Sequence, residues 1–494
     1  MVDPRTPVLI GAGQISLRVD QGTEPVEPAD LIAEALRRGA DDTGVGSKAL
    51  AGADAIHIIS LLSWRYRNAA LVVAERLGAA PRDTTLSGLG GNSPQSVLNQ
   101  ACLDIQAGSA DLTLLGGAET WRTRSSNKAK GVDVGWTRQA DDVPLPRAST
   151  PDVAMSSAGE QARGVILPVQ VYPLFEQAIR IELGRGIDEH LEAMSGLWAR
   201  FSEVAATNPH AWIQQAYSAE EIRTPTPQNR MIGYPYTKLM NSNNAVEQGA
   251  GVILCSAERA KALGVPRDNW VFPYSGSDAH DHYFVSDRDR VGRSPAMRIA
   301  GAAALHLAGA TVDDLAHVDL YSCFPSAVEI AANELGLGLD RQLTVTGGLS
   351  FAGGPWNNYV MHSIATMAGV LREDPGSLGL VSANGGFITK HAFGVYGTTP
   401  PAGPFRHAEP QAEIDALPSR ELCEDPDGQA DIEAWTVMFD REGAPETGIL
   451  VGLLADGRRA WGVTTEPGAV KAMVTEELAG RRAALRPDGA FDLV

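Results

Sequence analysis

An internal duplication constrains the fold of this chain more than any other feature. The first copy reads LSGLGGNSPQSVLNQACLDIQAGSADLTLLGGAET, and the second reads LSFAGGPWNNYVMHSIATMAGVLREDPGSLGLVSANGG. Each copy has Leu-Ser, two residues, a glycine pair, a helical pattern, an apolar strand and a second glycine pair. A helix, a turn and a strand precede each copy, so we predict two similar β-α-β-α-β units over about 5–120 and 268–390. Continuous apolar strands that alternate with helices indicate mainly parallel, buried sheets.

Two further regions lie outside the duplicated units. The segment between the units is too long for a structureless loop, and it opens with the basic stretch WRTRSSNKAKG, so we predict a separate loop domain. Near the C-terminus an acidic, proline-containing stretch precedes three short strands and a helix, which predicts a small, mostly β domain that folds apart, with an OB-like barrel as one candidate. The predicted domains are an N-terminal half over 1–120, a loop domain over 121–245, a C-terminal half over 246–405 and an extra domain over 410–494.

Charge and composition exclude several classes of function. The formal net charge of −19 argues against nucleic acid as a partner, because phosphate binding needs a basic face. No apolar run is long enough to cross a bilayer, and the first residues lack the pattern of a signal peptide. The four cysteines are scattered without metal-ligand spacing, which is typical of a reducing compartment. We therefore expect a cytoplasmic protein.

Several motifs resemble the thiolase superfamily. The segment TTLSGLGGNSPQ resembles its nucleophile loop, and DLYSCF is similar to the His-Asp-Cys-Phe element of the sterol-carrier-protein-type thiolases. GGLSFAGGP stands where the family has Gly-His-Pro, LVSANGG where it has Cys-x-Gly, and NNAVEQGAGVILCSAERAKALGV where its chain re-enters the second half. The resemblance implies a duplicated α/β fold in αβαβα layers, a homodimer, and binding of acyl-CoA for Claisen condensation or its reverse.

The resemblance also implies that the ionisable catalytic groups of the family are missing. The nucleophilic cysteine falls on Gly90, the histidine of Gly-His-Pro on Gly354, and the histidine of the fourth motif on Tyr321. The second cysteine falls on Ala383, or on Ser382 if the register shifts by one. We therefore expect that the covalent mechanism is lost.

A few polar groups remain on the loops that would form the site. We predict Tyr321 and His391 as catalytic groups, against the alternative that both are structural. For the glycine turn at the start of the first central helix, tight helix packing is the alternative to a retained carbonyl site. The basic side chains of Arg122, Arg124 and Lys128 would meet the phosphates of CoA. The predicted substrate-binding residues are Gly90, Gly91, Asn92, Ser93, Asn244, Gly354, Asn384, Gly385 and Lys390.

No cofactor or metal is predicted. His280 and His282 alternate along a strand, but no third ligand has suitable spacing, so we predict no metal site. Cys323 is predicted to be structural, and CoA is expected as substrate or ligand rather than as a resident cofactor.

Three functions stay open, and with them the question whether the chain is an enzyme. It could be a thiolase-like acyltransferase relative of lipid metabolism that binds CoA or acyl-CoA without covalent chemistry. It could be a retro-aldol lyase acting on β-hydroxyacyl-CoA, because that reaction needs an acid or base but no acyl-enzyme. It could also be a non-catalytic partner or scaffold protein.

Overall fold

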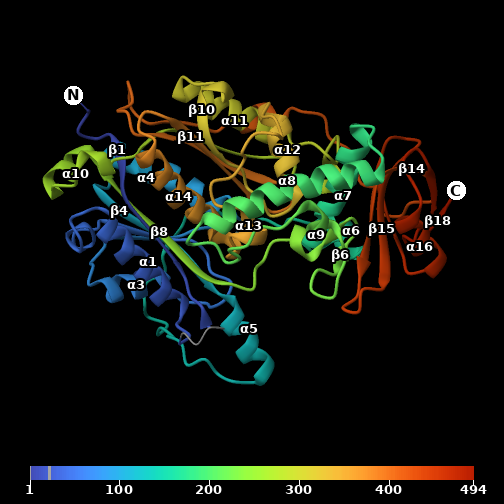
Figure 1. Cartoon of the computed structure of the whole chain (residues 1–494), viewed down its shortest axis with the longest axis horizontal. Coiled ribbons are helices and arrows are strands. Elements are labelled where there is room, and N and C mark those ends of the chain that lie inside the picture. The colour runs from blue at the N-terminus through green and yellow to red at the C-terminus, as the bar shows by residue number, and fades with distance from the viewer. Residues whose placement is uncertain (1, 20–23) are drawn as a thin grey trace.

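A computed structural model describes residues 2–19 and 24–494 of the chain, and it contains three sheets (Figure 1). The first sheet has the strand order β1-β8-β4-β2-β3-β5 and the second has the order β10-β11-β12-β9-β13. The strands of the first sheet are β1 (Pro7–Ser16), β2 (Ala55–Ile58), β3 (Asp83–Leu86), β4 (Leu112–Thr120), β5 (Arg147–Ala148) and β8 (Glu247–Ser256). Those of the second are β9 (Phe272–His280), β10 (Leu315–Asp319), β11 (Leu378–Gly385), β12 (Lys390–Gly397) and β13 (Arg406–Ala408).

The two sheets confirm the duplication. The order β1-β8-β4-β2 in the first sheet corresponds to β9-β12-β11-β10 in the second. In both series the first two pairings are antiparallel and the third is parallel. The chain therefore repeats one architectural unit, as the sequence motifs predict.

The sheets are mainly parallel, as predicted, and the exceptions are β8 and β12, which run antiparallel to both of their neighbours. The connection from β11 to β12 is too short for a crossover and therefore forces the antiparallel arrangement. The predicted boundary at 246 is wrong, because it assigned β8 to the second half, whereas β8 lies between β1 and β4 in the first sheet.

Helices separate and cover these two sheets. The central helices α4 and α14 pack between the sheets, α1 and α3 cover the outer face of the first sheet, and α11 covers that of the second with α12 beside it. In α4 the buried residues Val97, Leu98, Ala101, Cys102 and Ile105 recur with helical spacing. The bounds are α1 (Pro28–Asp42), α2 (Lys48–Ala51), α3 (Ala69–Leu77), α4 (Ser93–Ala107), α10 (Ala257–Leu263), α11 (Pro295–Ala308), α12 (Pro325–Leu335), α13 (Gly348–Phe351) and α14 (Tyr359–Glu373).

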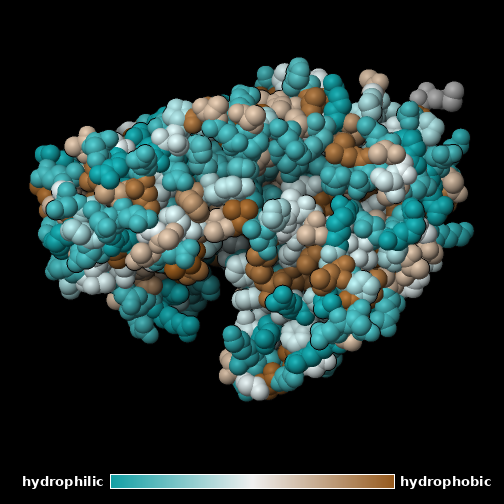
Figure 2. Space-filling view, turned by 180° about the vertical axis from the view of Figure 1, so that it is seen from behind, coloured by the Kyte–Doolittle hydropathy of each residue, from teal (hydrophilic) through white to brown (hydrophobic). Residues whose placement is uncertain are grey.

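The segment between the two halves is mostly helical. Its longest helix is α8, and its basic opening stretch forms the protruding helix α5 (Figure 1). The elements are α5 (Trp121–Lys130), α6 (Ala158–Ala162), α7 (Pro168–Glu182), α8 (Ile187–Thr207), α9 (Ala219–Arg223), β6 (Met231–Gly233) and β7 (Tyr236–Thr237). Seen from behind, the surface is deeply hollowed between the lobe that carries α5 and the lobe that carries the C-terminal strands (Figure 2).

The C-terminal strands form a third sheet with the order β16-β15-β14-β17-β18. The amide of Val463 in β16 donates to the carbonyl of Gly489 just before β18 (2.8 Å), so the sheet nearly closes on itself, as a five-stranded OB-type barrel does. β6 pairs with β14 and joins this sheet to the insertion. The bounds are α15 (Gln411–Asp415), β14 (Gly428–Phe439), β15 (Pro445–Leu454), β16 (Arg459–Thr464), α16 (Pro467–Thr475), β17 (Arg482–Leu485) and β18 (Phe491–Leu493). No helix in the described ranges is long and apolar enough to cross a membrane.

Candidate functional site

A cavity of about 510 Å³ lies where two glycine turns meet. The turn of the first half contains Gly90 and Gly91, and the turn of the second half contains Gly385 and Gly386 after β11. The cavity is lined by both duplicated halves and by the start of α7 from the insertion. Its wall is largely apolar, and Ile166 and Leu167 are more than half exposed. The lining residues are Gly90, Gly91, Met155, Ile166, Leu167, Pro168, Val169, Tyr172, Asn241, Ser242, Asn244, Tyr321, Cys323, Phe324, Leu349, Trp356, Asn357, Asn384, Gly386 and Phe387.

The turn before α4 has glycines because the backbone and its neighbours leave no room for a side chain. Gly90 has a φ of 140°, a conformation that other residues rarely adopt. A Cβ on Gly91 would lie 2.4 Å from the hydroxyl of Tyr321 and 2.5 Å from the carbonyl oxygen of Asn384. Gly385 packs against the same turn, since its own Cβ would lie 3.2 Å from the Cα of Gly90. The two halves therefore approach each other through glycine backbone.

Helix α4 begins directly after this turn. Asn92 is the N-cap residue, and Ser93 opens the helix, followed by Pro94. The hydroxyl of Ser93 donates to the carbonyl of Gly88 (2.7 Å), so it holds the turn together rather than facing a ligand. The amide of Gly91 has no hydrogen-bond partner within the described ranges. This amide is a candidate donor to a ligand carbonyl.

Tyr321 follows β10 and presents its phenol to the cavity. Its backbone amide donates to Ser382 Oγ (2.9 Å), and its ring packs edge-on against Tyr359. Its hydroxyl makes no hydrogen bond to any residue that the structure describes. Burial, together with Cys323 and Tyr359 nearby, raises the pKa of Tyr321 well above its ordinary value. The phenol therefore stays protonated at neutral pH and can serve as a hydrogen-bond donor.

Asn384 lies beside Tyr321 at the end of β11. Its Nδ2 donates to the hydroxyl of Tyr172 (3.0 Å), which in turn donates to the carbonyl of Gly386 (3.0 Å). The other side-chain atom, Oδ1, is buried without a partner among the described residues. Tyr172 thus fixes Asn384 from the insertion, a contact that no motif in the sequence indicates.

Cys323 contributes the one thiol that lines the cavity within the described ranges. Burial raises the pKa of this thiol to about 12, even though Tyr172 and nearby backbone amides favour the thiolate. A thiol with such a pKa is a weak nucleophile at neutral pH. This agrees with the structural role predicted for it.

Asn244 and Gly354 lie close together, and Asn244 lines the cavity. Asn244 Oδ1 accepts a hydrogen bond from Ser242 Oγ (2.7 Å), and both residues line the cavity. Gly354 donates its amide to the carbonyl of Asn243 (2.9 Å). A Cβ at Gly354 would lie 2.2 Å from Ser242 Oγ, so this glycine supports the loop of Asn244 and does not line the cavity.

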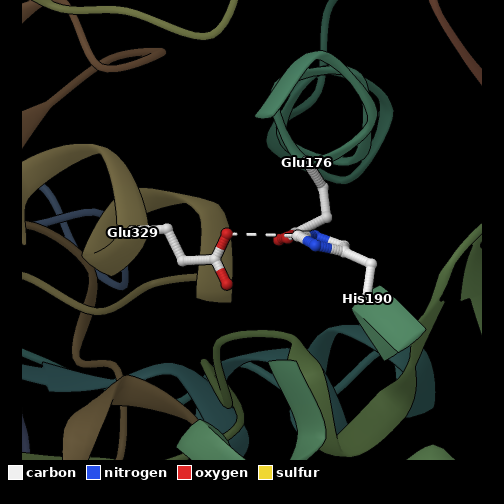
Figure 3. Close-up of side chains that lie close together, drawn as sticks. All are labelled: Glu176, His190 and Glu329. Carbon is white, nitrogen blue, oxygen red and sulfur yellow. Dashed lines mark hydrogen bonds and ion pairs between the residues drawn. The ribbon is translucent and has the colours of Figure 1, made fainter. Parts of the chain in front are cut away.

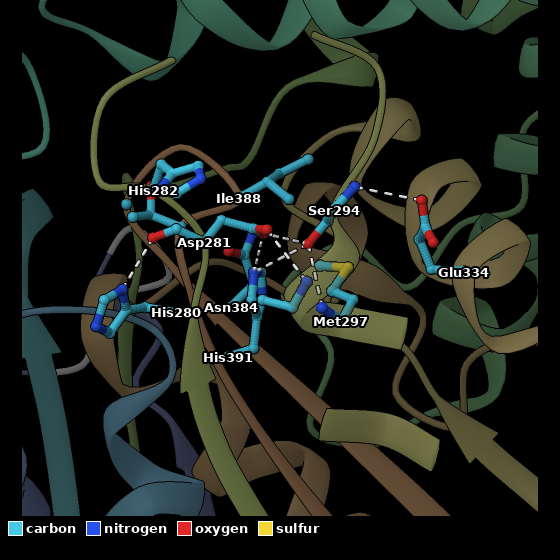
Figure 4. A network of polar contacts seen from close by, with 12 residues as sticks. His280, Asp281, His282, Ser294, Met297, Glu334, Asn384, Ile388 and His391 are labelled. Atoms are coloured by element: carbon cyan, nitrogen blue, oxygen red, sulfur yellow. Dashed lines mark hydrogen bonds and ion pairs between the residues drawn. The ribbon is translucent and has the colours of Figure 1, made fainter. Parts of the chain in front are cut away.

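Lys390 and His391 point to opposite faces of β12. Lys390 Nζ donates to the carbonyl of Leu89 behind the first glycine turn, and burial lowers the pKa of this amine. His391 Nε2 lies 3.1 Å from Asp281 Oδ2 and 3.2 Å from Ser294 Oγ (Figure 4). Neither residue lines the cavity, so the structure does not bring His391 together with Tyr321.

The basic helix α5 begins beside the cavity. Trp121, its first residue, packs edge-on against Trp356 of the cavity wall, with ring centroids 5.1 Å apart. Arg122 and Lys128 are exposed on this helix, and the Arg124 guanidinium lies over the ring of Trp64. Cationic side chains therefore extend away from the cavity along α5.

His280 ends β9 and His282 follows the strand, and neither belongs to a group of three possible metal ligands among the described residues. His280 Nδ1 contacts the carbonyl of Asp281 (2.9 Å), and its ring stacks on Tyr283. Figure 4 shows His280 and His282 on either side of Asp281. The cluster of possible metal ligands found among the described residues lies elsewhere.

Comparisons with known proteins agree with this architecture. Residues 409–490 match the family model "Thiolase-like protein type 1 additional C-terminal domain". The crystal structure of a monomeric SCP2-thiolase like protein type 1 from Mycobacterium smegmatis is 33% identical and covers 100% of both chains, with a TM-score of 0.84. The Ltp2-ChsH2(DUF35) aldolase is 19% identical over 80% of this chain and 98% of its own, with a TM-score of 0.61.

A relative found by sequence belongs to the acetyl-CoA acetyltransferases. An acetyl-CoA acetyltransferase from Methanocaldococcus jannaschii is 22% identical over 310 residues, which are 62% of this chain and 70% of that protein. Since the Mycobacterium smegmatis relative spans the whole chain at 33% identity, the chain belongs to the thiolase superfamily, among the SCP2-thiolase-like proteins of type 1.

Proposed function

We propose that this protein binds a CoA thioester in the cavity between the two glycine turns and does so without forming an acyl-enzyme. The observation that carries the proposal is the unpartnered hydroxyl of Tyr321, which faces the cavity beside the free amide of Gly91. Two donors at one place are what a thioester carbonyl needs. The apolar wall around them suits an acyl chain, and the exposed cations of α5 suit the phosphates of CoA.

The lack of a nucleophile supports non-covalent binding. Gly90 and Gly91 have no side chain, and the cavity thiol of Cys323 has a pKa raised to about 12. Tyr321 stays protonated and so is no general base at neutral pH. We therefore assign the cavity to recognition of the thioester rather than to acyl transfer.

Calorimetric titration with CoA, acetyl-CoA and β-hydroxyacyl-CoA tests the proposal. Tyr321→Phe removes one donor and should weaken thioester binding by roughly 3- to 12-fold, the worth of one net hydrogen bond. Tyr283→Phe is the matched control, because Tyr283 stacks on His280 outside the cavity. The absence of CoA binding at millimolar ligand would refute the proposal, and so would an acyl adduct on any cysteine in the intact-protein mass spectrum.

A retro-aldol lyase acting on β-hydroxyacyl-CoA is the second candidate. The same Tyr321 phenol favours it, since a donor to the thioester oxygen would stabilise the enolate that this cleavage forms. His391 lies outside the cavity, so the lyase would depend on Tyr321 alone among the two predicted groups. Release of an aldehyde or ketone from β-hydroxyacyl-CoA by the wild type, abolished in Tyr321→Phe, would select the lyase.

The absence of both CoA binding and turnover would leave the third candidate, a non-catalytic partner or scaffold protein. Homodimer formation, expected from the resemblance, stays a prediction. The Mycobacterium smegmatis relative is described as monomeric. Multi-angle light scattering on the full chain measures the mass directly.

A further inference from the structure

Three buried side chains with metal-binding atoms converge behind the cavity. Glu176 comes from α7, His190 from α8 and Glu329 from α12, and Figure 3 shows the three side chains directed toward one another. One ligand atom of each lies within 4.8 Å of the other two. His190 Nε2 is 2.5 Å from Glu176 Oε1 and 3.9 Å from Glu329 Oε2.

The cluster is closed to solvent and incompletely satisfied. The side chains of Glu176, His190 and Glu329 are at most 3% exposed. Glu329 Oε2 is buried, faces the imidazole and has no geometric hydrogen-bond donor among the residues that the structure describes. A hydrogen bond between the carboxyl groups of Glu329 and Glu176 forms only when one of the two is protonated. A buried carboxylate without a donor is costly, so this oxygen calls for a proton or a cation.

Burial raises the pKa of both carboxyl groups, and the charge of Arg185 acts to lower it, but Arg185 makes no direct ion pair with them. No lysine or arginine within the described ranges forms an ion pair with Glu176 or Glu329. The nearby Arg180 is paired instead with Glu477 (2.8 Å). Two carboxyl groups therefore share a buried space with one imidazole and no direct counter-ion.

We propose that Glu176, His190 and Glu329 form a binding site for a divalent transition-metal ion of the Zn²⁺ class. One imidazole nitrogen and two carboxylate oxygens are a donor set that such ions accept. Tyr236 donates its hydroxyl to Glu176 Oε2 (2.5 Å), which orients this carboxylate and leaves Oε1 toward the imidazole. Because the ligands come from three helices, their spacing in sequence gives no metal motif.

The ion would tie the insertion to the second half directly behind the cavity wall. Tyr172 precedes Glu176 by one turn of α7, and Phe324 precedes α12 and stacks on Tyr172. The Tyr236 hydroxyl also accepts a hydrogen bond from the amide of Ser326 (3.2 Å), and Ser326 Oγ donates to the carbonyl of Tyr172 (3.1 Å). The bound ion therefore has a structural role, holding α7, α8 and α12 in register.

The test uses the full chain without a polyhistidine tag, stripped with EDTA and titrated with ZnCl₂. We expect one Zn²⁺ per chain by calorimetry and by elemental analysis. With Zn²⁺ about 100-fold above its Kd, the melting temperature should rise by roughly 3 °C or more. Less than about 0.2 Zn²⁺ per chain together with an unchanged melting temperature would overturn the proposal.

Two single substitutions locate the site. Glu329→Gln and His190→Gln should each weaken Zn²⁺ binding at least about 10-fold. His317→Gln is the matched control, because His317 pairs with Asp374 near the surface, and it should bind Zn²⁺ as the wild type does. Wild-type affinity in both cluster variants would place the ion elsewhere and overturn the assignment.

A spectroscopic measurement covers the case in which both variants misfold. Co²⁺ replaces Zn²⁺ with similar ligands and reports on them through its visible ligand-field bands. The wild type loaded with one equivalent of Co²⁺ should show these bands, and Zn²⁺ should displace them. A spectrum identical to that of Co²⁺ in buffer would refute the site.

Discussion

Replacing Gly90 by alanine should destabilise the chain more than the same replacement at Gly46. Both glycines have positive φ, 140° at Gly90 and 62° at Gly46, so both substitutions strain the backbone. The added Cβ meets nothing within 4 Å at Gly46, whereas at Gly90 it would lie 2.4 Å from Asn92 Oδ1 and 3.0 Å from Lys390 Nζ. Backbone strain alone costs about 1–2 kcal/mol at Gly46. The clash with the buried Oδ1 of Asn92 brings the cost at Gly90 to about 2–4 kcal/mol.

Urea denaturation followed by tryptophan fluorescence compares the two variants with the wild type. The midpoint should fall further for Gly90→Ala than for Gly46→Ala. Gly90→Cys tests the functional side of the same argument. Because its side chain would meet Asn92 and no histidine base stands at Gly354, we expect no thiolysis of acetoacetyl-CoA. Equal midpoints for the two alanine variants, or rapid acylation of the introduced thiol, would refute the reasoning.

Two further predictions concern buried ion pairs outside the cavity. Burial acts to raise the pKa of Asp281, but the hydrogen bond and charge of His391 outweigh it and hold this pKa below its ordinary value. The stability that Asp281 contributes is therefore complete above about pH 4 and is lost as the pH falls through the depressed pKa. Asp281→Asn should thus make the free energy of unfolding depend less on pH in the acid range, without changing ligand affinity. An unchanged pH dependence in that range would contradict this. Arg459 is fully buried and pairs with Glu433 (2.8 Å). Arg459→Met should therefore destabilise the chain by about 3–5 kcal/mol and speed tryptic cleavage near 405–430. An unchanged cleavage rate would show that the contact is dispensable.

The duplication and most helices are predictable because their signals are local. The repeated Leu-Ser and glycine pairs, the periodicity of α8 and the strand pattern of β14 to β16 need only neighbouring residues to be recognised. The placement of β8 in the first sheet cannot be predicted from such local signals. β8 and β4 are neighbours in the first sheet although the whole insertion separates them in the chain, whereas their counterparts β11 and β12 are adjacent in sequence.

The site was predictable where it follows the repeated motifs and not where it depends on strand register. Gly90, Gly91, Tyr321 and Asn384 line one cavity, and their roles in catalysis or substrate binding stay predictions. Lys390 and His391 are adjacent in β12, so one must face away from the other, and only the pairing of β12 with β9 and β11 decides which. Tyr172 and the cluster of Glu176, His190 and Glu329 come from helices that no motif connects.

The C-terminal domain is bound to the rest of the chain more firmly than a detachable module would be. The sequence predicted that it folds apart, yet β6 of the insertion extends its sheet, and Tyr234 lies in its hydrophobic core. Arg459 donates to the carbonyls of Val285 and Ser286 in the second half.

Helix α7 connects this domain to the cavity. Arg180 near the end of α7 pairs with Glu477 and lies over the ring of Trp435, while Tyr172 near the start of the same helix fixes Asn384 in the cavity. Because one helix carries both contacts, a change at the domain interface alters the position of the cavity wall. The additional domain therefore supports the cavity wall from outside, through its contacts with α7.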